Sequence, residues 1–124
     1  MRRHAFTLAL ILLLGLPGVG LAAENAWFGF DVSAETEGVN ILNPTVRSLT
    51  IEGIDRDSPA AARGLQKGDQ IIEVQGIRVA GSKASALEDA VPAKPGLPLH
   101  LKIRRGSTPP FAVTLIGVAE PGGG

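Results

Sequence analysis

The sequence contains no cysteine and no tyrosine, and its 124 residues include only one Trp and four Phe. The absence of cysteine excludes disulfides, thiolate metal sites and a lipid-modified cysteine. Because aromatic residues make up 4% and hydrophobic residues 44% of the chain, the core must be built mainly from Val, Ile, Leu and Ala. Twelve basic residues balance twelve acidic ones, so the basic excess that nucleic-acid binding normally needs is missing.

The length of the chain is sufficient for one domain and too short for two domains with separate hydrophobic cores. Sixteen glycines and nine prolines indicate many turns, and no internal repeat is present. We therefore expect a single small domain.

The N-terminus has the layout of a secretory signal peptide. Arg2 and Arg3 form a positive start, and residues 5–14 follow as an almost unbroken apolar run. Gly15, Pro17 and further glycines then break any helix before a stretch of small residues. This order predicts export to the periplasm or the medium.

Small residues around Ala22 and Ala23 are suited to signal peptidase, so we expect residues 1–23 to be removed after one of these two alanines. Cleavage leaves ten basic and twelve acidic residues, a net charge of −2. The alternative is an uncleaved membrane anchor, because residues 5–23 carry no charge and come close to the ~20 residues that span a bilayer. The domain is expected outside the cytoplasm in both cases.

Residues 24–118 are expected to form the domain, and its first half indicates two strands. Apolar residues at every second position predict a strand over residues 27–33 with one buried face. Residues 35–44 are polar and glycine-containing, which predicts a loop before a second strand over residues 46–54.

A short helix and two strands are predicted next. Ser58 is a suitable N-cap, Pro59 suits the first helical position, and Gly64 ends the helix. A strand over residues 70–74 follows, and a tight Gln-Gly turn joins it to a short strand over residues 77–79.

The last third of the chain predicts a helix and a hairpin. The helix covers residues 83–91, with Ser82 as its cap and Pro92 after its end. Strands over residues 99–104 and 111–116 alternate between apolar and other positions. Residues 119–124 are rich in Pro and Gly and are expected to form a disordered tail.

Three stretches carry a resemblance to a known family. Trp27-Phe28-Gly29-Phe30 is similar to a carboxylate-binding loop commonly written Gly-Leu-Gly-Phe, and residues 58–72 are similar to a short helix followed by Gly-Asp and a buried strand. Residues 74–79 continue the pattern. In this order the chain resembles the PDZ domain family over residues 26–116, in particular the bacterial PDZ domains of trypsin-like heat-shock proteases. The resemblance implies an α+β fold, a small, partly open β-barrel of five to six strands with two short helices.

The loop has a chemical rationale of its own. A glycine between Phe28 and Phe30 lets backbone N–H groups converge, and such nests bind carboxylates. The strand beginning at Phe30 can offer its edge to an extended peptide, which adds as a further strand. We expect replacement of Gly29 by Val to impair peptide capture more than folding.

The resemblance implies that the amides of Phe28, Gly29 and Phe30 hold a terminal carboxylate. Phe28, Phe30, Leu87 and Val91 would then line the pocket for the last ligand side chain. The alternative is that both phenylalanines serve only the core. The peptide-binding residues implied in total are Trp27, Phe28, Gly29, Phe30, Asp31, Val32, Leu87 and Val91.

Two features depart from the family pattern. Many members have Arg or Lys shortly before the loop, where this chain has Glu24, Asn25 and Ala26. The groove helix, residues 83–91, also contains no histidine, so a ligand preference linked to a helix histidine does not transfer.

No catalytic, metal or cofactor site is predicted. His100 falls on the solvent side of its strand, and no serine lies in a nucleophile-like turn. Asp55 and Asp57 lack the rest of a calcium loop and fit turn and cap positions. The basic residues of the terminal hairpin are interpreted as a solvated face, with a contact for anionic lipid or an acidic partner as the alternative. They are Lys102, Arg104 and Arg105.

The function predicted is a non-enzymatic, exported module that captures C-termini or extended segments of envelope proteins by β-strand addition. An envelope protease or a secretion component is an expected partner. Nucleic acid is not, and membrane contact is expected only if the signal stays uncleaved. The alternative is a structural or adaptor component of an envelope complex that docks through another surface.

Overall fold

The computed structural model describes residues 6–10 and 25–121. The expected cleavage site and residues 122–124 of the expected tail lie outside these ranges. The helices are α1 (Pro59–Ala62) and α2 (Ala84–Ala90). The strands are β1 (Phe6–Leu10), β2 (Ala26–Trp27), β3 (Phe30–Glu37), β4 (Thr45–Ile54), β5 (Gln70–Val74), β6 (Ile77–Arg78), β7 (Pro98–Arg104), β8 (Phe111–Ile116) and β9 (Val118–Ala119).

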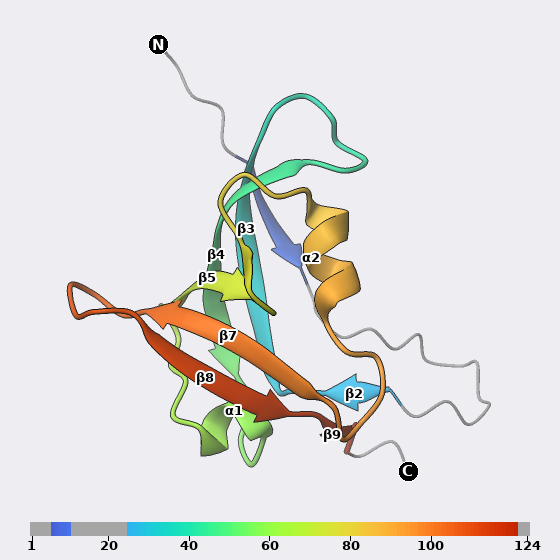
Figure 1. Cartoon of the computed structure of the whole chain (residues 1–124), viewed down its shortest axis with the longest axis vertical. Helices are drawn as coiled ribbons and strands as arrows, with labels where there is room; N and C mark the ends of the chain where they lie inside the picture. The colour runs from blue at the N-terminus through green and yellow to red at the C-terminus, as the bar shows by residue number, and fades with distance from the viewer. Residues whose placement is uncertain (1–5, 11–24, 122–124) are drawn as a thin grey trace.

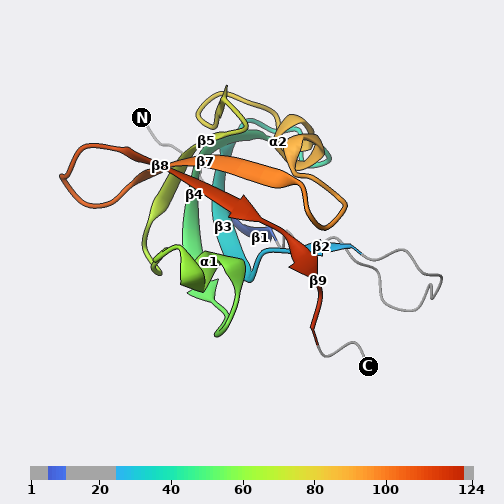
Figure 2. The ribbon, with the colours of Figure 1, turned by 60° about the horizontal axis from the view of Figure 1, so that its bottom comes forward.

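The main sheet has the strand order β1-β3-β4-β5-β7-β8, with β6 paired to β5, and β2 pairs separately with β9. All of these pairs are antiparallel. Figures 1 and 2 show the sheet curving between the two short helices, which lie well apart. The predicted α+β fold is confirmed, and within the described residues the sheet stays open and does not close into a barrel.

The buried face of the sheet forms one hydrophobic core. Its described members all lie between Ala26 and Leu115, and aliphatic side chains dominate it, as the composition predicts. Each fully buried large side chain contributes about 1.5–3 kcal/mol to the hydrophobic term. The largest of these side chains are Ile51, Ile71, Leu99, Ile103 and Leu115.

The first predicted strand of the domain is divided in two. The chain leaves β2 after Trp27 and enters β3 only at Phe30, because Gly29 has a positive φ of 82° that a strand does not accommodate. β3 then continues to Glu37, into the predicted loop, by pairing with β4 up to Thr45.

The cap of α2 differs from the prediction. Lys83 occupies the N-cap position without a side-chain hydrogen bond, and the Ser82 hydroxyl instead donates to the carbonyl of Arg78 at 2.6 Å. The amide of Ser85 donates to Oδ1 of Asn43 at 3.0 Å. A side chain 42 residues earlier in the chain therefore satisfies the first turn of this helix.

β2 and β9 lie side by side at the bottom of the molecule in Figure 1. Val118 and Ala119 of β9 pair with Trp27 and Ala26 of β2, so pairing extends one residue beyond the predicted end of the domain. Neither described helix is long and apolar enough to cross a membrane.

Candidate functional site

Two hydrogen bonds fix the orientation of the peptide groups in the turn between β2 and β3. The carbonyl of Phe28 accepts a hydrogen bond from the amide of Ala60 at 3.0 Å, and the carbonyl of Gly29 accepts one from the amide of Asp55 at 2.8 Å. In a trans peptide the N–H points opposite to the carbonyl, and no cis peptide occurs in the described chain. The amide of Gly29 therefore points away from α1, and the amide of Phe30 points away from Asp55 at the end of β4.

Gly29 is held against the start of α1. Ser58 is buried and caps α1, because its Oγ accepts from the amide of Ala61 at 3.0 Å and donates to the carbonyl of Asp55 at 2.7 Å. A Cβ built on Gly29 would overlap the Ser58 side chain. The loop thus requires glycine for two reasons, its positive φ and its close approach to the helix cap.

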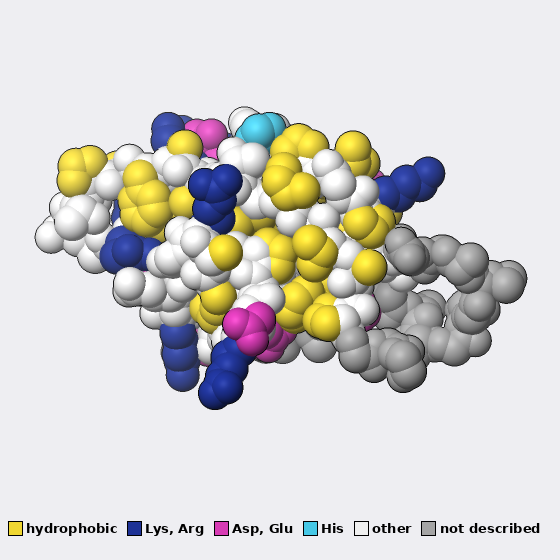
Figure 3. Space-filling model, turned by 90° about the horizontal axis from the view of Figure 1, so that it is seen from below, with side chains coloured by type: hydrophobic (Ala, Val, Ile, Leu, Met, Phe, Trp, Pro, Cys, Tyr) yellow, Lys and Arg dark blue, Asp and Glu magenta, His cyan; other side chains and the backbone are white. Residues whose placement is uncertain are grey.

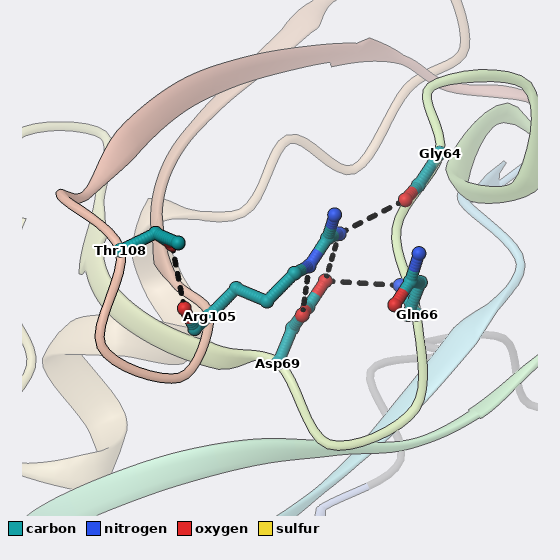
Figure 4. A network of polar contacts seen from close by, with 5 residues as sticks. All are labelled: Gly64, Gln66, Asp69, Arg105 and Thr108. Carbon is teal, nitrogen blue, oxygen red and sulfur yellow. Dashed lines mark hydrogen bonds and ion pairs between the residues drawn. The ribbon is translucent and has the colours of Figure 1, made fainter.

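The other end of α1 is fixed by a polar network (Figure 4). Nε and Nη2 of Arg105 donate to the two carboxylate oxygens of Asp69 at 2.8 and 2.7 Å. Nη2 also donates to the carbonyl of Gly64 at 3.0 Å, and Asp69 accepts from the amide of Gln66 at 2.9 Å. Arg105 is therefore a structural residue, which corrects its assignment to a solvated basic face.

The Asp69 carboxylate is charged and almost fully buried, with 2% of its side chain exposed. The hydrogen bond from Arg105 holds the pKa of Asp69 below its ordinary value, although burial acts in the opposite direction. The guanidinium also lies over the ring of Phe111, 5.1 Å from its centroid. This paired charge joins the hairpin of β7 and β8 to the segment that supports the loop.

The predicted pocket residues of α2 and β3 are buried. Leu87 and Val91 from α2 belong to the one hydrophobic core of the domain, as do Phe30 and Val32 from β3. The amide of Ala84 at the start of α2 donates to the carbonyl of Pro44, just beyond the far end of β3, so α2 runs antiparallel to β3. Val91, which follows α2, consequently lies toward the end of β3 that adjoins Gly29.

The remaining predicted residues have different positions. Trp27 is half-buried in β2, and the ring of Phe28 lies in the core, where a Cβ on Gly117 would approach it to 3.0 Å. Asp31 is exposed, with its carboxylate beside Gly53 of β4. The burial of Phe28 and Phe30 agrees with a role in the core, and Phe30 also begins the groove strand.

The outer edge of β3 is paired with β1, which Figure 1 shows on the side of β3 that faces α2. The antiparallel register runs from Phe6 opposite Thr36 to Leu10 opposite Val32. The C-terminal end of β1 therefore points toward the loop at Gly29. Part of the apolar run that the sequence assigns to an export signal thus forms a strand on the edge predicted to receive ligands.

Two hollows lie outside the loop. One of about 200 Å³ lies between β3, the start of α2 and the loop before β4. A second of about 440 Å³ lies between β4, β5 and β6, and its lining includes three arginines. These are Arg47, Arg78 and Arg104.

Apolar side chains are also exposed on the underside of the molecule, among a few charged ones (Figure 3). The large exposed ones near β8 and β9 are Leu97, Ile116 and Val118.

His100 is exposed as predicted, and its Nδ1 lies 3.0 Å from Oγ1 of Thr114 on the neighbouring strand. Asp57 occupies a left-handed turn conformation with φ 57°, and the carbonyl of Asp55 accepts a hydrogen bond from the Ser58 hydroxyl.

The described part of the chain contains no group of three or more His, Cys, Asp or Glu side chains placed to hold a metal ion.

A family comparison identifies the fold. The model of the PDZ domain family matches residues 19–104, more than half of the chain, so the chain belongs to the PDZ domain family. A comparison with curated proteins gives no match.

Solved structures show the same fold at low sequence identity. The HtrA3 PDZ domain bound to the phage-derived ligand FGRWV is 21% identical with a TM-score of 0.55, covering 77% of this chain and 88% of that domain. A variant of the HtrA-type protease AlgW with a decapeptide is 19% identical with a TM-score of 0.57, covering 81% of this chain and 30% of the protease. The PDZ domain of the carboxy-terminal protease from Vibrio cholerae, in complex with a peptide, is 18% identical with a TM-score of 0.51, covering 76% and 93%.

Proposed function

We propose that this PDZ domain is an exported peptide-binding module that captures C-termini or extended segments of envelope proteins by strand addition to β3. The observation that carries the proposal is the pairing of β1 with β3. In it the edge of β3 carries an antiparallel strand over five residues, and main-chain pairing of this kind is the way an extended peptide adds to a sheet.

The direction of that added strand supports capture of a C-terminus. A ligand that continues the register of β1 places its last residues beside Phe30, where the amide of Gly29 points away from α1 and the amide of Phe30 points away from Asp55. Convergent amides at a glycine turn attract a carboxylate. The HtrA3 and Vibrio cholerae PDZ domains were each solved with a bound peptide, which fits the same role.

Export rests on the sequence of residues 1–23. If these residues are removed after Ala22 or Ala23, β1 is lost and the edge of β3 becomes available to other strands. The described hydrophobic core lies entirely between Ala26 and Leu115, so the processed chain retains it. Binding in the envelope then requires no opening of the fold. The proposed module needs no catalytic residue or cofactor of its own.

The test is a titration of the full chain and of the chain beginning at Glu24 with labelled peptides. A peptide ending in a free carboxylate is expected to bind the shorter form more tightly, because β1 competes in the longer one. The same peptide with a C-terminal amide should bind less well. Amide NMR shifts should change along β3 and α2. Shifts confined to other strands, or equal affinity for acid and amide, would contradict carboxylate capture in the groove.

The cleft that contains Arg47, Arg78 and Arg104 favours the second candidate, an adaptor that docks through another surface. Its positive lining suits an acidic segment of a partner protein. Arg78→Glu is expected to weaken such docking and to leave peptide titration at β3 unchanged, which separates the two functions.

A further inference from the structure

The hollow of about 200 Å³ beside α2 lies at the end of the groove opposite to the carboxylate loop. Its apolar lining comes from three directions. Ala34 belongs to β3, Ala84 to α2, and Ile41 and Leu42 to the loop between β3 and β4. Ile41 and Leu42 are 83% and 92% exposed, so most of their apolar surface is available to a ligand.

The two exposed side chains stand on a well-anchored turn. Oδ1 of Asn40 accepts hydrogen bonds from the amides of Leu42 and Asn43, both at 3.1 Å. Asn43 in turn accepts from the amide of Ser85 in α2. The loop therefore presents its apolar side chains at a fixed place beside the first turn of the helix.

The register of β3 defines which ligand residues reach this hollow. Phe30, Val32, Ala34 and Thr36 share the buried face of β3, and the backbone of β1 pairs with residues 32–36 in an antiparallel register without a shift. Residues opposite each other in an antiparallel pair project to the same face. A ligand whose last residue lies beside Phe30 therefore directs its fifth and seventh residues from the end toward Ala34 and Thr36, which both line the hollow.

One acidic side chain lines the hollow. Glu88 is the one ionisable side chain among the described residues that line it, and it lies one helical turn after Ala84. Because α2 begins beside Pro44 and runs antiparallel to β3, Glu88 lies further toward the Gly29 end of β3 than Ala84 does. A basic ligand side chain opposite Ala34 would lie next to this carboxylate.

We infer that this hollow is a second specificity subsite of the peptide groove, which takes an apolar side chain opposite Thr36 and a Lys or Arg opposite Ala34. The inference rests on the proposed strand addition to β3 and extends it. It assigns the ligand class as segments of at least seven residues, with an apolar residue seventh and a basic residue fifth from the C-terminus.

The probe is the labelled peptide Leu-Ser-Lys-Ser-Ala-Ala-Val with a free carboxylate, compared with versions in which Ser replaces its Leu or Gln replaces its Lys. Titrations use the full chain and, in parallel, the chain beginning at Glu24. Partial burial of the Leu side chain is expected to make the parent peptide bind about fivefold more tightly than the Ser version. The Lys should contribute about twofold at low salt and lose this contribution at high salt.

Variants of the protein locate the effect. Leu42→Ser and Ile41→Ser are expected to abolish the preference for Leu while the fold is kept, because both side chains are exposed. Val39→Ser is the matched control, since Val39 belongs to the same loop and is 95% exposed without lining the hollow. Glu88→Gln should abolish the preference for Lys, and Asp89→Asn, one residue further along α2, should retain it.

The outcomes separate the subsite from the strand addition. Equal affinity for the Leu and Ser peptides overturns the subsite and leaves strand addition standing. Failure of every peptide to bind either form overturns strand addition and the subsite with it. Analytical ultracentrifugation without peptide compares the oligomeric state of the unmodified chain with that of Leu42→Ser. A dimer that is lost in Leu42→Ser would assign these apolar side chains to a contact between copies of the chain, and it would also overturn the subsite.

Discussion

Replacement of Gly29 by Ala is the most direct test of the way the turn between β2 and β3 is built. The new methyl group meets two obstacles. A non-glycine residue at φ 82° is strained, and its Cβ would overlap the side chain of Ser58, which is buried at the cap of α1. The substitution therefore acts on folding as well as on binding.

The magnitude follows from these two terms. The left-handed conformation costs about 1–2 kcal/mol in a non-glycine residue, and forcing a methyl group into a packed site costs about 1–3 kcal/mol. We expect Gly29→Ala to lower the free energy of unfolding by about 2–5 kcal/mol. Ser58→Gly removes the overlapping Cβ, and as an N-cap Gly costs only a few tenths of a kcal/mol relative to Ser. The lost hydroxyl bond to Asp55 adds about 1 kcal/mol.

Urea unfolding of the two single variants and the double variant forms a double-mutant cycle. The double variant is expected to unfold with a free energy about 1–3 kcal/mol higher than the sum of the two single effects predicts. It keeps the backbone strain at position 29, but the new Cβ no longer overlaps a side chain at position 58. Ser58→Ala, which retains a Cβ, is the matched control and should give no such recovery. Strict additivity in the Ser58→Gly cycle would refute the close approach of the loop to the helix cap.

Three further predictions follow from other parts of the chain. Mass spectrometry of the exported protein should find Ala23 or Glu24 as the first residue, and recovery of the intact chain from membranes would support the anchor alternative. Because Arg105 lowers the pKa of Asp69 in the folded protein, the ionised carboxylate stabilises the fold above its unfolded-state pKa, and this contribution is lost as the pH falls through the lower folded-state pKa. Asp69→Asn should therefore reduce stability at neutral pH and flatten its decline below about pH 4 in urea titrations. Asn43→Ala should cost about 1 kcal/mol by leaving the Ser85 amide without its acceptor, whereas Asn43→Asp should retain most of the stability.

Local patterns predicted most of the fold because their physical causes are local. Alternation identified the buried faces of β3, β7 and β8, and the Ser-Pro start of α1 gave its cap and first turn correctly. The cap of α2 was assigned to Ser82 because that serine is adjacent in sequence. The actual acceptor, Asn43, comes from a loop 42 residues away, and only the tertiary structure shows that it reaches the helix.

The candidate site was predicted in part for the same reason. Gly29 and its two aromatic neighbours form a contiguous motif, so the sequence alone locates the turn at Gly29, while its binding of a carboxylate stays a prediction. Its consequence for folding was underestimated, because the expectation that Gly29→Val would mainly impair binding did not include the overlap with Ser58. Arg105 was placed on a solvated face because three basic residues lie close together in sequence, while its pairing with Asp69 spans 36 residues.

On the proposed function, the position of β1 would link export to binding. The segment that must be apolar to act as a signal also pairs with β3 over residues 32–36, on the edge that would receive a ligand. Because β1 belongs to the same chain, it competes with a free peptide for the edge of β3 at a high effective concentration. The unprocessed chain would therefore bind peptides weakly. Removal of residues 1–23 abolishes this competition without touching the described hydrophobic core, whose members all lie between Ala26 and Leu115. On the proposed function, the edge would therefore become available only after the chain has been processed at the place where its ligands are found.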